Sequence, residues 1–523
     1  MGGEQAFRSR DLRHRPGALN RANDSVAAVL DALSMFSFDN SFARMPERFY
    51  ARVAPTKVRN PRVVRVNTSL ATLLGATVDE LTSPAGVACL VGNDIPPGAE
   101  PLALAYAGHQ FGVFVPQLGD GRAVLLGEVV GADGQRRDIQ LKGAGRTPFS
   151  RGGDGRAALG PVLREYLVSE AMAALGIPTT RALAAATTGE PVMREQMLPG
   201  AVLTRVAASH LRVGTFEFFA ARDDHEGLVA LTAHALARHY PAAAGRGDDA
   251  LALLESVIAA QASLVARWMA VGFVHGVMNT DNTAISGETL DYGPCAFLDE
   301  YDPARTFSSI DHGGRYAFAN QPRIAQWNMI RLAETLLGLM SGGRDEAIEA
   351  AKDRLGRFPA LFDEARLRGL RAKLGLLRDQ PDDRALADDL LRRLAENRVD
   401  HTIFFRRLCS SAVDPTSDDD VASLFDDPNA FRTWADAWRR RLAAEVASPE
   451  TRAAAMRRAN PAFIPRNHRV EEAIDAAVRL GDFGPFERLA DALARPYDDQ
   501  PEHADLAAPP GPEQRDYRTF CGT

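Results

Sequence analysis

Lysine, cysteine and long apolar runs are all scarce in this chain of 523 residues. The four cysteines form no CxxC pair and no regular spacing, which argues against a disulfide framework or a zinc ribbon. Such sparing use of cysteine fits a reducing compartment, so we expect a cytoplasmic protein. No stretch approaches about 18 uncharged apolar residues, and the arginine-containing N-terminus lacks the apolar segment of a secretory signal. We therefore expect no membrane span.

Overall composition excludes further classes of protein. Hydrophobic residues make up 46% of the chain and charged residues 25%, which are ordinary values for a globular protein and exclude a disordered, collagenous or coiled-coil chain. The formal net charge of −7 gives no basis for binding nucleic acid or an anionic membrane. The length predicts a large core spread over about three to four domain equivalents.

The few lysines indicate where a lysine is needed. Of 61 lysine and arginine residues only four are lysines, namely Lys57, Lys142, Lys352 and Lys373. In a chain that uses arginine so heavily, a retained lysine indicates a position where a planar guanidinium cannot replace a compact ammonium, such as a tight phosphate site.

The order of the predicted elements divides the chain into a β-rich part and a helical part. Residues 1–35 predict an arm and a helix, residues 36–215 a β-rich lobe, and residues 216–494 a helical lobe with a helical extension. Residues 495–523 contain five prolines and predict an extended, poorly packed tail. We expect an α+β fold with a small β-rich lobe followed by a large helical lobe, as in protein kinases.

The clearest β region lies between Gly112 and Lys142. Strands are predicted at 113–118, 123–130 and 138–141, and Gly119-Asp120-Gly121 and Asp133-Gly134 form the turns. These three strands predict an antiparallel meander. The next segment, 143–160, holds six glycines and predicts a long functional loop, followed by a helix from Pro161 to Gly176.

Several residues in this β-rich part are candidates for phosphate binding. No GxxxxGK[ST] motif is present and no GxGxxG opens a helix after a strand, which excludes P-loop and Rossmann sites. Gly119, Gly121 and Arg122 lie in a turn whose amides can approach an anion, although most such turns have no ligand. Lys142 ends the third strand, where a kinase has its phosphate-binding lysine, and a buried lysine needs a carboxylate partner.

The helix after the glycine-rich loop offers two carboxylates to Lys142. Glu165 and Glu170 differ by about 140° around a helix axis, so only one of them can face the strand. We expect this partner to be Glu165.

A second cluster, HGVMNTDN, spans His275 to Asn282 and is followed by Asp291-Tyr292-Gly293. The side-chain oxygens of Asn282 and Asp291 are the hard ligands that Mg²⁺ prefers. A kinase catalytic loop has His and then Asn seven positions later, as here, but its base lies two residues after the His, which in this chain is Val277. The only carboxylate of the loop is Asp281. Asp-Asn pairs and a DYG triplet also occur in ordinary turns.

These motifs, taken together with longer blocks, carry a resemblance to a known family. The blocks are YAGHQFGVFVPQLGDGRAVLLGE, DIQLKGAGRTPFSRGGDGRAALG, VLTRVAASHLRVGTFEFF, HGVMNTDN, DYGPCAFLDEYDP and NPAFIPRNHRVEEAI. They resemble the selenoprotein O family of protein adenylyltransferases, which have a kinase-like fold, and the resemblance covers roughly Phe36 to the C-terminus. It implies transfer of AMP from ATP to Ser, Thr or Tyr hydroxyls of proteins, with ATP bound in the reverse orientation relative to kinases.

The resemblance also implies roles for individual residues. Asp281 matches the proton acceptor, and Asn282 and Asp291 match the ligands of Mg²⁺ or Mn²⁺, Asp291 lying also at the nucleotide. The positions that match ATP contacts are Gly119, Gly121, Arg122, Lys142, Asp154, Gly155, Arg205 and Arg212. If their segment is helical, Arg205 and Arg212 are two turns apart and suited to hold a terminal phosphate.

A terminal cysteine is a redox candidate. Cys521 matches the position where some members of the family carry selenocysteine. Some members have a second cysteine shortly after the DYG block, but Arg305 to Ser309 contains none, which leaves Cys295 as the possible substitute.

The sequence as a whole predicts a cytoplasmic, Mg²⁺- or Mn²⁺-dependent protein adenylyltransferase whose partners are protein substrates, with no role for nucleic acid or a membrane. A conventional kinase-type phosphotransferase and an ATP-binding scaffold without activity remain open as alternatives. The sequence gives no indication of the oligomeric state.

Overall fold

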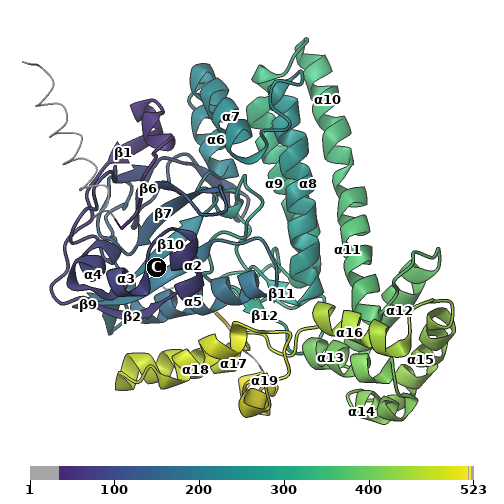
Figure 1. Cartoon of the computed structure of the whole chain (residues 1–523). Helices are drawn as coiled ribbons and strands as arrows, with labels where there is room; N and C mark the ends of the chain where they lie inside the picture. The colour runs from purple at the N-terminus through teal and green to yellow at the C-terminus, as the bar shows by residue number, and fades with distance from the viewer. Residues whose placement is uncertain (1–34, 516, 520–523) are drawn as a thin grey trace, which may run out of the picture.

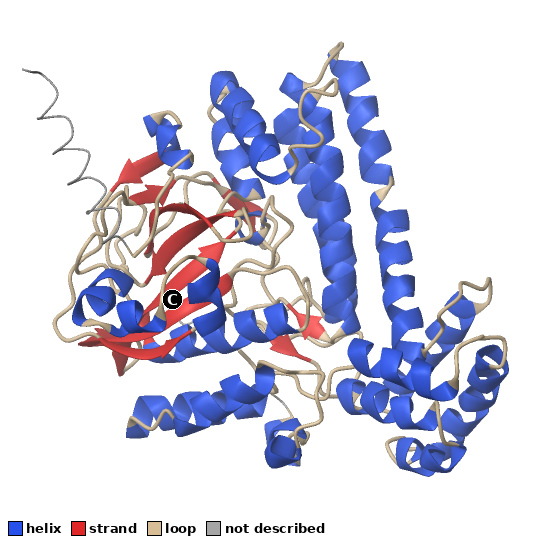
Figure 2. Ribbon diagram, in the orientation of Figure 1, coloured by secondary structure: helices blue, strands red, loops and turns tan. Residues whose placement is uncertain are grey.

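The computed structural model describes residues 35–515 and 517–519 of the chain. The predicted N-terminal helix and Cys521 lie outside these residues. Figure 2 shows an antiparallel sheet with a few helices on one side and a large group of helices on the other. A mixed α+β architecture is therefore confirmed.

The sheet has eight strands and lies in the N-terminal half. Its path runs β1-β3-β6-β7-β10-β9-β2, with β8 paired to β10, and every pair is antiparallel. Side chains of β6 are buried almost throughout and those of β7 from Asp138 to Leu141, as expected of central strands. In path order the strands are Tyr50–Arg52, Leu102–Leu104, Ala123–Val130, Arg136–Lys142, Met197–Ala207, Arg181–Met193 and Arg62–Val66, and β8 is Ala157–Ala158.

The predicted three-stranded meander is only partly right. The hairpin of β6 and β7 forms as expected, with β6 at its predicted bounds. The first strand is wrong: β5 (Val113–Val115) pairs with β4 (Gly108–Gln110) in a separate two-stranded sheet. The segment after β5 is bound to the end of β3 and the residues just after it. Leu118 N–H donates to the Tyr106 carbonyl and Asp120 N–H to the Leu104 carbonyl.

The long strands β9 and β10 went unpredicted, and they change the setting of the two candidate arginines. Arg205 lies in β10, and Arg212 directly precedes α6 (Val213–Ala220). The expectation of two helical turns between them is therefore wrong. Alanine-rich β9 is a strand because it pairs along most of its length with β10 and β2, so tertiary context outweighs local propensity.

Helix α5 (Leu159–Ala174) begins two residues before the predicted Pro161 and contacts β9 and β10. Short helices α2, α3 and α4 pack on the part of the sheet formed by β2, β9 and β10. The helical part stands beside the sheet, with α8, α9 and α11 side by side (Figure 1). The remaining bounds are α2 Thr68–Leu73, α3 Val78–Thr82, α4 Pro84–Leu90, α7 His225–His239, α8 Asp249–Ala270, α9 Gln321–Leu336, α10 Arg344–Gly356, α11 Phe358–Leu374, α12 Asp383–Glu396, α13 His401–Ser411, α14 Asp418–Ala422, α15 Pro428–Leu442 and α16 Pro449–Ala459.

Helix α8 is long and apolar enough to cross a membrane by length and composition alone. A search for an uncharged run passes over it because Glu255 interrupts the apolar residues. Most of its apolar window is buried, and it contacts α7, α9, α10 and α11. These are the surroundings of a core helix in a globular lobe.

The C-terminal segment, which follows helices α12 to α16, lies next to the N-terminal half of the chain. Helices α17 (Asn467–Asp475) and α18 (Gly484–Leu493) lie beneath α5 (Figure 1). Beyond α19 (Ala504–Ala507), Thr519 N–H donates to the Phe307 carbonyl and Thr519 accepts from Ser309 N–H at 3.0 Å. The predicted loose tail is therefore wrong for the described residues, because buried side chains such as Leu506 anchor it.

Candidate active site

A buried group of charges forms where β7, β10 and α5 meet the DYG segment. The Lys142 Nζ donates to Glu165 Oε2 at 2.5 Å and also to Asp291 Oδ1. The predicted choice between the two glutamates is confirmed, because Glu170 instead accepts from Arg181 Nε at 2.9 Å. Helix phase allowed only one of the two glutamates, and the position of Glu165 one turn beyond the predicted helix start favoured it over Glu170.

Arg205 completes this group from the neighbouring strand. Its Nε donates to Glu165 Oε1 at 2.7 Å, and its Nη2 lies 3.3 Å from Asp291 Oδ1. Burial by itself would raise the pKa of Asp291, but the charges of Lys142 and Arg205 outweigh it and hold the pKa well below the usual range. Asp291 also has a left-handed backbone with φ of 68°, which a non-glycine residue rarely adopts. The surroundings thus fix one ionised carboxylate in one orientation.

The HGVMNTDN loop places a second carboxylate in a different environment. Asp281 lies in the short turn η3 (Thr280–Asn282) and is only 8% exposed. Gln110 Nε2 donates to its Oδ2 at 3.1 Å, whereas its buried Oδ1 has no hydrogen-bond partner among the described residues. Burial raises the pKa of Asp281 to about 6. Asn282 follows it, with Nδ2 donating to the Val277 carbonyl at 3.1 Å, so the kinase base position contributes only backbone.

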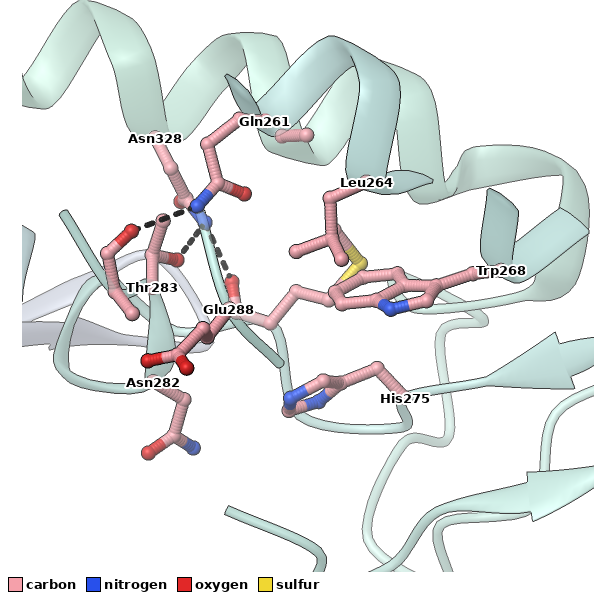
Figure 3. Close-up of a pocket in the computed structure, with 11 residues that line it drawn as sticks. Gln261, Leu264, Trp268, His275, Asn282, Thr283, Glu288 and Asn328 are labelled. Carbon is pink, nitrogen blue, oxygen red and sulfur yellow. Dashed lines mark hydrogen bonds between the residues drawn. The ribbon is translucent and has the colours of Figure 1, made fainter. Parts of the chain in front are cut away.

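Side-chain amides from the helical part hold this loop from behind. Asn328 of α9 donates to the Met278 carbonyl and to Thr283 Oγ1, at 3.0 and 2.9 Å. Gln261 of α8 donates to the Ala284 carbonyl at 2.8 Å. Figure 3 shows these residues around a cavity of about 10 Å³, which is too small for a ligand and leaves room for one water at most. The loop is therefore anchored to both α8 and α9.

Arg212 lies beside Asp281 and is held by neighbours from the sheet region. Its guanidinium lies 4.1 Å from the centre of the Tyr106 ring, and its Nη1 donates to the Asp281 carbonyl at 3.1 Å. Its Nη2 lies 3.8 Å from Asp120 Oδ1. Tyr106 and Gln110 are functional candidates that the residue-by-residue reasoning missed. They are about 170 residues from the loop in sequence, so no local spacing could have found them.

The glycines of the turn before β6 are needed for close packing. A Cβ on Gly119, whose φ is 82°, would lie 2.4 Å from the Phe149 ring, and one on Gly121 would lie 2.8 Å from the Phe149 carbonyl oxygen. The glycine-rich loop 143–160 thus folds directly onto the turn. Arg122 and Lys142 line a cavity of about 350 Å³ that also reaches Tyr517 and Thr519 of the tail.

Asp154 and Gly155 lie on the outer part of this loop. The Asp154 carboxylate pairs with Arg194 at 2.9 Å and accepts from Arg156 N–H. Gly155 has φ of 69°, and its carbonyl accepts from Gly145 N–H at 3.0 Å. Within the described residues, no hydrogen bond or ion pair joins Asp154 to Lys142, Asp281 or Asp291, so the structure does not bring it into the charged group.

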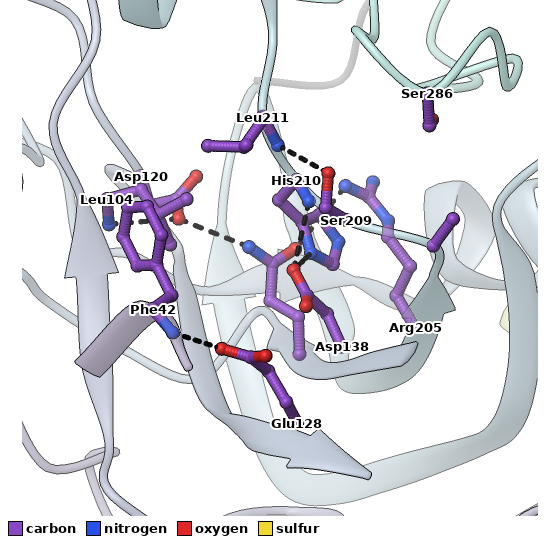
Figure 4. Close-up of polar contacts among 12 residues, drawn as sticks. Phe42, Leu104, Asp120, Glu128, Asp138, Arg205, Ser209, His210, Leu211 and Ser286 are labelled. Carbon is purple, nitrogen blue, oxygen red and sulfur yellow. Dashed lines mark hydrogen bonds and ion pairs between the residues drawn. The ribbon is translucent and has the colours of Figure 1, made fainter. Parts of the chain in front are cut away.

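A buried ionic network lies at the junction between sheet and helices, and Figure 4 shows its contact between Asp138 and His210. Asp138 of β7 accepts from the backbone N–H of His210 at 2.9 Å and lies the same distance from its Nδ1. Arg238 of α7 lies 2.6 Å from both Asp138 and Glu128 of β6. The segment between β10 and α6, which carries Arg212, is thereby held to the sheet.

The cysteine that could substitute in a redox pair is poorly placed for one. Cys295 is fully buried, and burial raises the pKa of its thiol to about 12. A thiol that stays protonated is a weak nucleophile.

Comparison with known proteins places this arrangement in a family. A family model described as "Protein adenylyltransferase SelO" matches residues 32–494. The chain belongs to the SelO family. Three relatives are each named "Protein nucleotidyltransferase YdiU". The Methylorubrum populi protein is 63% identical over 94% of this chain and its own whole length. The Rhodopseudomonas palustris protein is 61% identical over 93% and 99%, and the Rhizobium meliloti protein 59% over 94% and 100%.

The SelO match also sets the limits of the family region. It ends at residue 494, within one residue of the end of α18, and so includes the helices beneath α5. It contains Tyr106, Gln110, Lys142, Asp281 and Asp291, and thus the whole charged group.

Proposed function

We propose that this chain transfers AMP from ATP to hydroxyl side chains of protein substrates. The observation that carries the proposal is the pair of carboxylates in opposite environments: Asp291 held ionised beside Lys142 and Arg205, and Asp281 buried with one oxygen free of hydrogen bonds. Such a pair suits one carboxylate for metal binding and the other for accepting a proton. Membership of a family described as protein adenylyltransferases supports the same reaction.

The two parts of the molecule act in this proposal as the lobes of a kinase-like fold. Residues 36–215 form the smaller nucleotide-binding lobe, and residues 216–494 the helical lobe with its extension. A strand lysine paired with a helix glutamate, followed by an Asn and an Asp from the other part, supports this assignment. The scarcity of cysteine supports a cytoplasmic location.

ATP lies in reverse between the lobes in this proposal, with its β- and γ-phosphates inward. The cations Lys142, Arg205 and Arg212 are all largely buried, which suits them to hold the charged end of the nucleotide. Arg122 faces the same cavity as Lys142. The packed turn at Gly119 and Gly121 presents backbone close to this place. The α-phosphate then faces the acceptor hydroxyl.

The reaction in this orientation is a single displacement at the α-phosphorus. The substrate oxygen forms a bond to this phosphorus while the bond to the oxygen bridging to the β-phosphate breaks, and pyrophosphate leaves. Asp281 Oδ1 has no hydrogen-bond partner within the described residues and is placed to accept the hydroxyl proton. A positioned base of this kind contributes about 10² to 10⁴ in rate. Arg212 and Lys142 stabilise the charge that develops on pyrophosphate.

The residues present fit a divalent cation such as Mg²⁺ or Mn²⁺. Lys142 and Arg205 occupy Asp291 Oδ1, which leaves Oδ2 without a hydrogen bond among the described residues, and Asn282 uses only its Nδ2. One carboxylate and one amide oxygen with nucleotide phosphates form a usual Mg²⁺ site. When bound, the cation supplies charge neutralisation at the phosphates.

Labelled ATP distinguishes this function from its alternatives. Label on protein from the α-phosphate and not from the γ-phosphate supports AMP transfer, and label from the γ-phosphate supports a conventional phosphotransferase. Binding of ATP with neither transfer supports a scaffold. Asp291→Ala should abolish transfer, and an active Asp291→Ala enzyme would contradict the metal-site assignment.

A further inference from the structure

The hairpin of β4 and β5 is fixed to the HGVMNTDN loop at three points. His109 N–H donates to Thr280 Oγ1 at 2.6 Å, Phe111 N–H to Asn279 Oδ1 at 3.1 Å, and Gln110 to Asp281. The His109 side chain is held by Glu217 at 2.6 Å. Whatever the hairpin binds is therefore held beside the proposed proton acceptor.

The outer side of this hairpin is exposed and apolar. Val113 is 69% and Phe114 37% exposed, which is unusual for large apolar side chains in a short strand. The Phe114 ring lies 5.0 Å from the His109 ring, which lies 5.3 Å from the Trp327 ring of α9. The rings of Phe114, His109 and Trp327 thus form one continuous surface, whereas Val113 points to the other face of the hairpin.

The free edge of β5 adds hydrogen-bonding capacity to this surface. His109 and Phe114 are directly opposite in the hairpin, and His109 N–H points away from β5 to Thr280. By the alternation of an antiparallel pair, the N–H and C=O of Phe114 point away from β4. Among the described residues they bond to nothing, so an extended peptide can pair there.

A cation at the tip of the hairpin gives the surface a charge. The Arg315 guanidinium lies 4.8 Å from the Trp327 ring and within 3.5 Å of a Cβ built on Gly112. It forms no ion pair with a carboxylate in the part of the chain that the structure describes. Arg331, over the same ring at 4.9 Å, already pairs with Glu334 at 2.7 Å. Only one of the two arginines is open to an external anion.

We propose that the hairpin surface, formed by Phe114, Trp327 and Arg315, binds the protein substrate through an extended segment that carries an acidic and an apolar side chain near the acceptor hydroxyl. The proposal rests on the proposed function, because it concerns the acceptor in that reaction. The attachment of the hairpin beside Asp281 and the uncompensated charge of Arg315 select this occupant over a basic one.

A peptide library tests the charge preference. The full-length chain is incubated with α-labelled ATP and peptides that each contain one Ser, Thr or Tyr and vary at the flanking positions. The wild type should label peptides with Asp or Glu about tenfold more than those with Lys or Arg, as expected for a complementary charge at the edge of an interface. Arg315→Glu should reverse this preference. The matched control Arg331→Gln should keep it.

The gain of basic peptides by Arg315→Glu is the decisive readout, because a merely structural defect lowers labelling of all peptides alike. Equal loss for all peptides, no preference in the wild type, or labelling of intact proteins without any labelled peptide would each overturn the proposal. Label from the γ-phosphate with the acidic preference retained would overturn AMP transfer and leave the docking surface standing.

A second copy of this chain is the competing occupant. Sedimentation of the wild type and of Phe114→Asp tests it. A concentration-dependent dimer that Phe114→Asp dissociates would assign the surface to self-association and overturn the proposal. An identical mass for both proteins, together with loss of apolar selection by Phe114→Asp in the library, supports it.

Discussion

Lys142 and Lys352 make a matched pair for the interpretation of the scarce lysines. Lys142 lies between Glu165 and Asp291, whereas the side chain of Lys352 is 65% exposed and pairs only with Glu349 on its own helix. We expect Lys142→Arg to lower AMP transfer by roughly 100-fold, because a planar guanidinium does not fit the geometry of a compact ammonium. Lys352→Arg should be neutral. Transfer of label from α-labelled ATP measures both, and equal activities would contradict the assignment.

Lys373 is a scarce lysine that the chain retains outside the charged group, so it needs a different explanation from Lys142. Its ammonium lies 4.2 Å from the Phe405 ring, and burial lowers its pKa to about 7. The unfolded chain therefore binds more protons between pH 7 and about 10.4, so the free energy of unfolding rises with pH across this range. Below pH 7 the cost of burying the charge is fully present.

Lys373→Met should remove that cost. We expect it to raise the free energy of unfolding by roughly 2 to 4 kcal/mol at pH 6, with a gain that shrinks as the pH approaches 10. Urea unfolding at several pH values measures the difference, with Lys352→Met as control. A gain that does not change with pH would show that Lys373 keeps its proton in the folded state above pH 7.

Helices α17 and α18 support the element that carries Glu165. Phe486 of α18 is fully buried, with its ring 5.7 Å from that of Tyr166, the neighbour of Glu165 in α5. Phe486→Ala should lower the free energy of unfolding by roughly 3 kcal/mol and raise the KM for ATP, because α5 loses its packing partner. Leu480→Ala, at a side chain that is 79% exposed, is the control. Thermal unfolding and initial rates measure the two effects. An unchanged KM would show that the packing of α18 on α5 does not affect the ATP site.

The sequence predicted those elements whose local signals agree with their tertiary setting. The β6–β7 hairpin has alternating apolar residues and an Asp-Gly turn, and it forms at the expected place. The strand β5 was paired wrongly because its partner β4 precedes it and its apolar side chains stay exposed. The Lys142–Glu165 pair followed from helix phase and from the position of Glu165 near the helix start, whereas Gln110 contacts Asp281 over a separation of 171 residues and Tyr106 contacts Arg212 over about 106.

Across the molecule, one arginine joins the helical part to two strands of the sheet. Arg238→Met would leave Glu128 and Asp138 buried with fewer partners, and we expect it to lower the free energy of unfolding by about 3 to 5 kcal/mol. Arg246→Met, at an exposed arginine in the loop after the same helix, should change it by less than about 0.5 kcal/mol. Urea unfolding decides the matter, and equal stabilities would mean that the network contributes nothing to joining the two parts.

The packing of the C-terminal helices beneath α5 sets an order of events during translation. Residues 467–493 leave the ribosome after all residues of the charged group have been synthesised, and Thr519, which lies beside Phe307 and Ser309, follows later. A nascent or stalled chain therefore carries Lys142, Asp281 and Asp291 without the support behind Glu165. The packing behind α5 is therefore completed only after residues 467–493 have been synthesised.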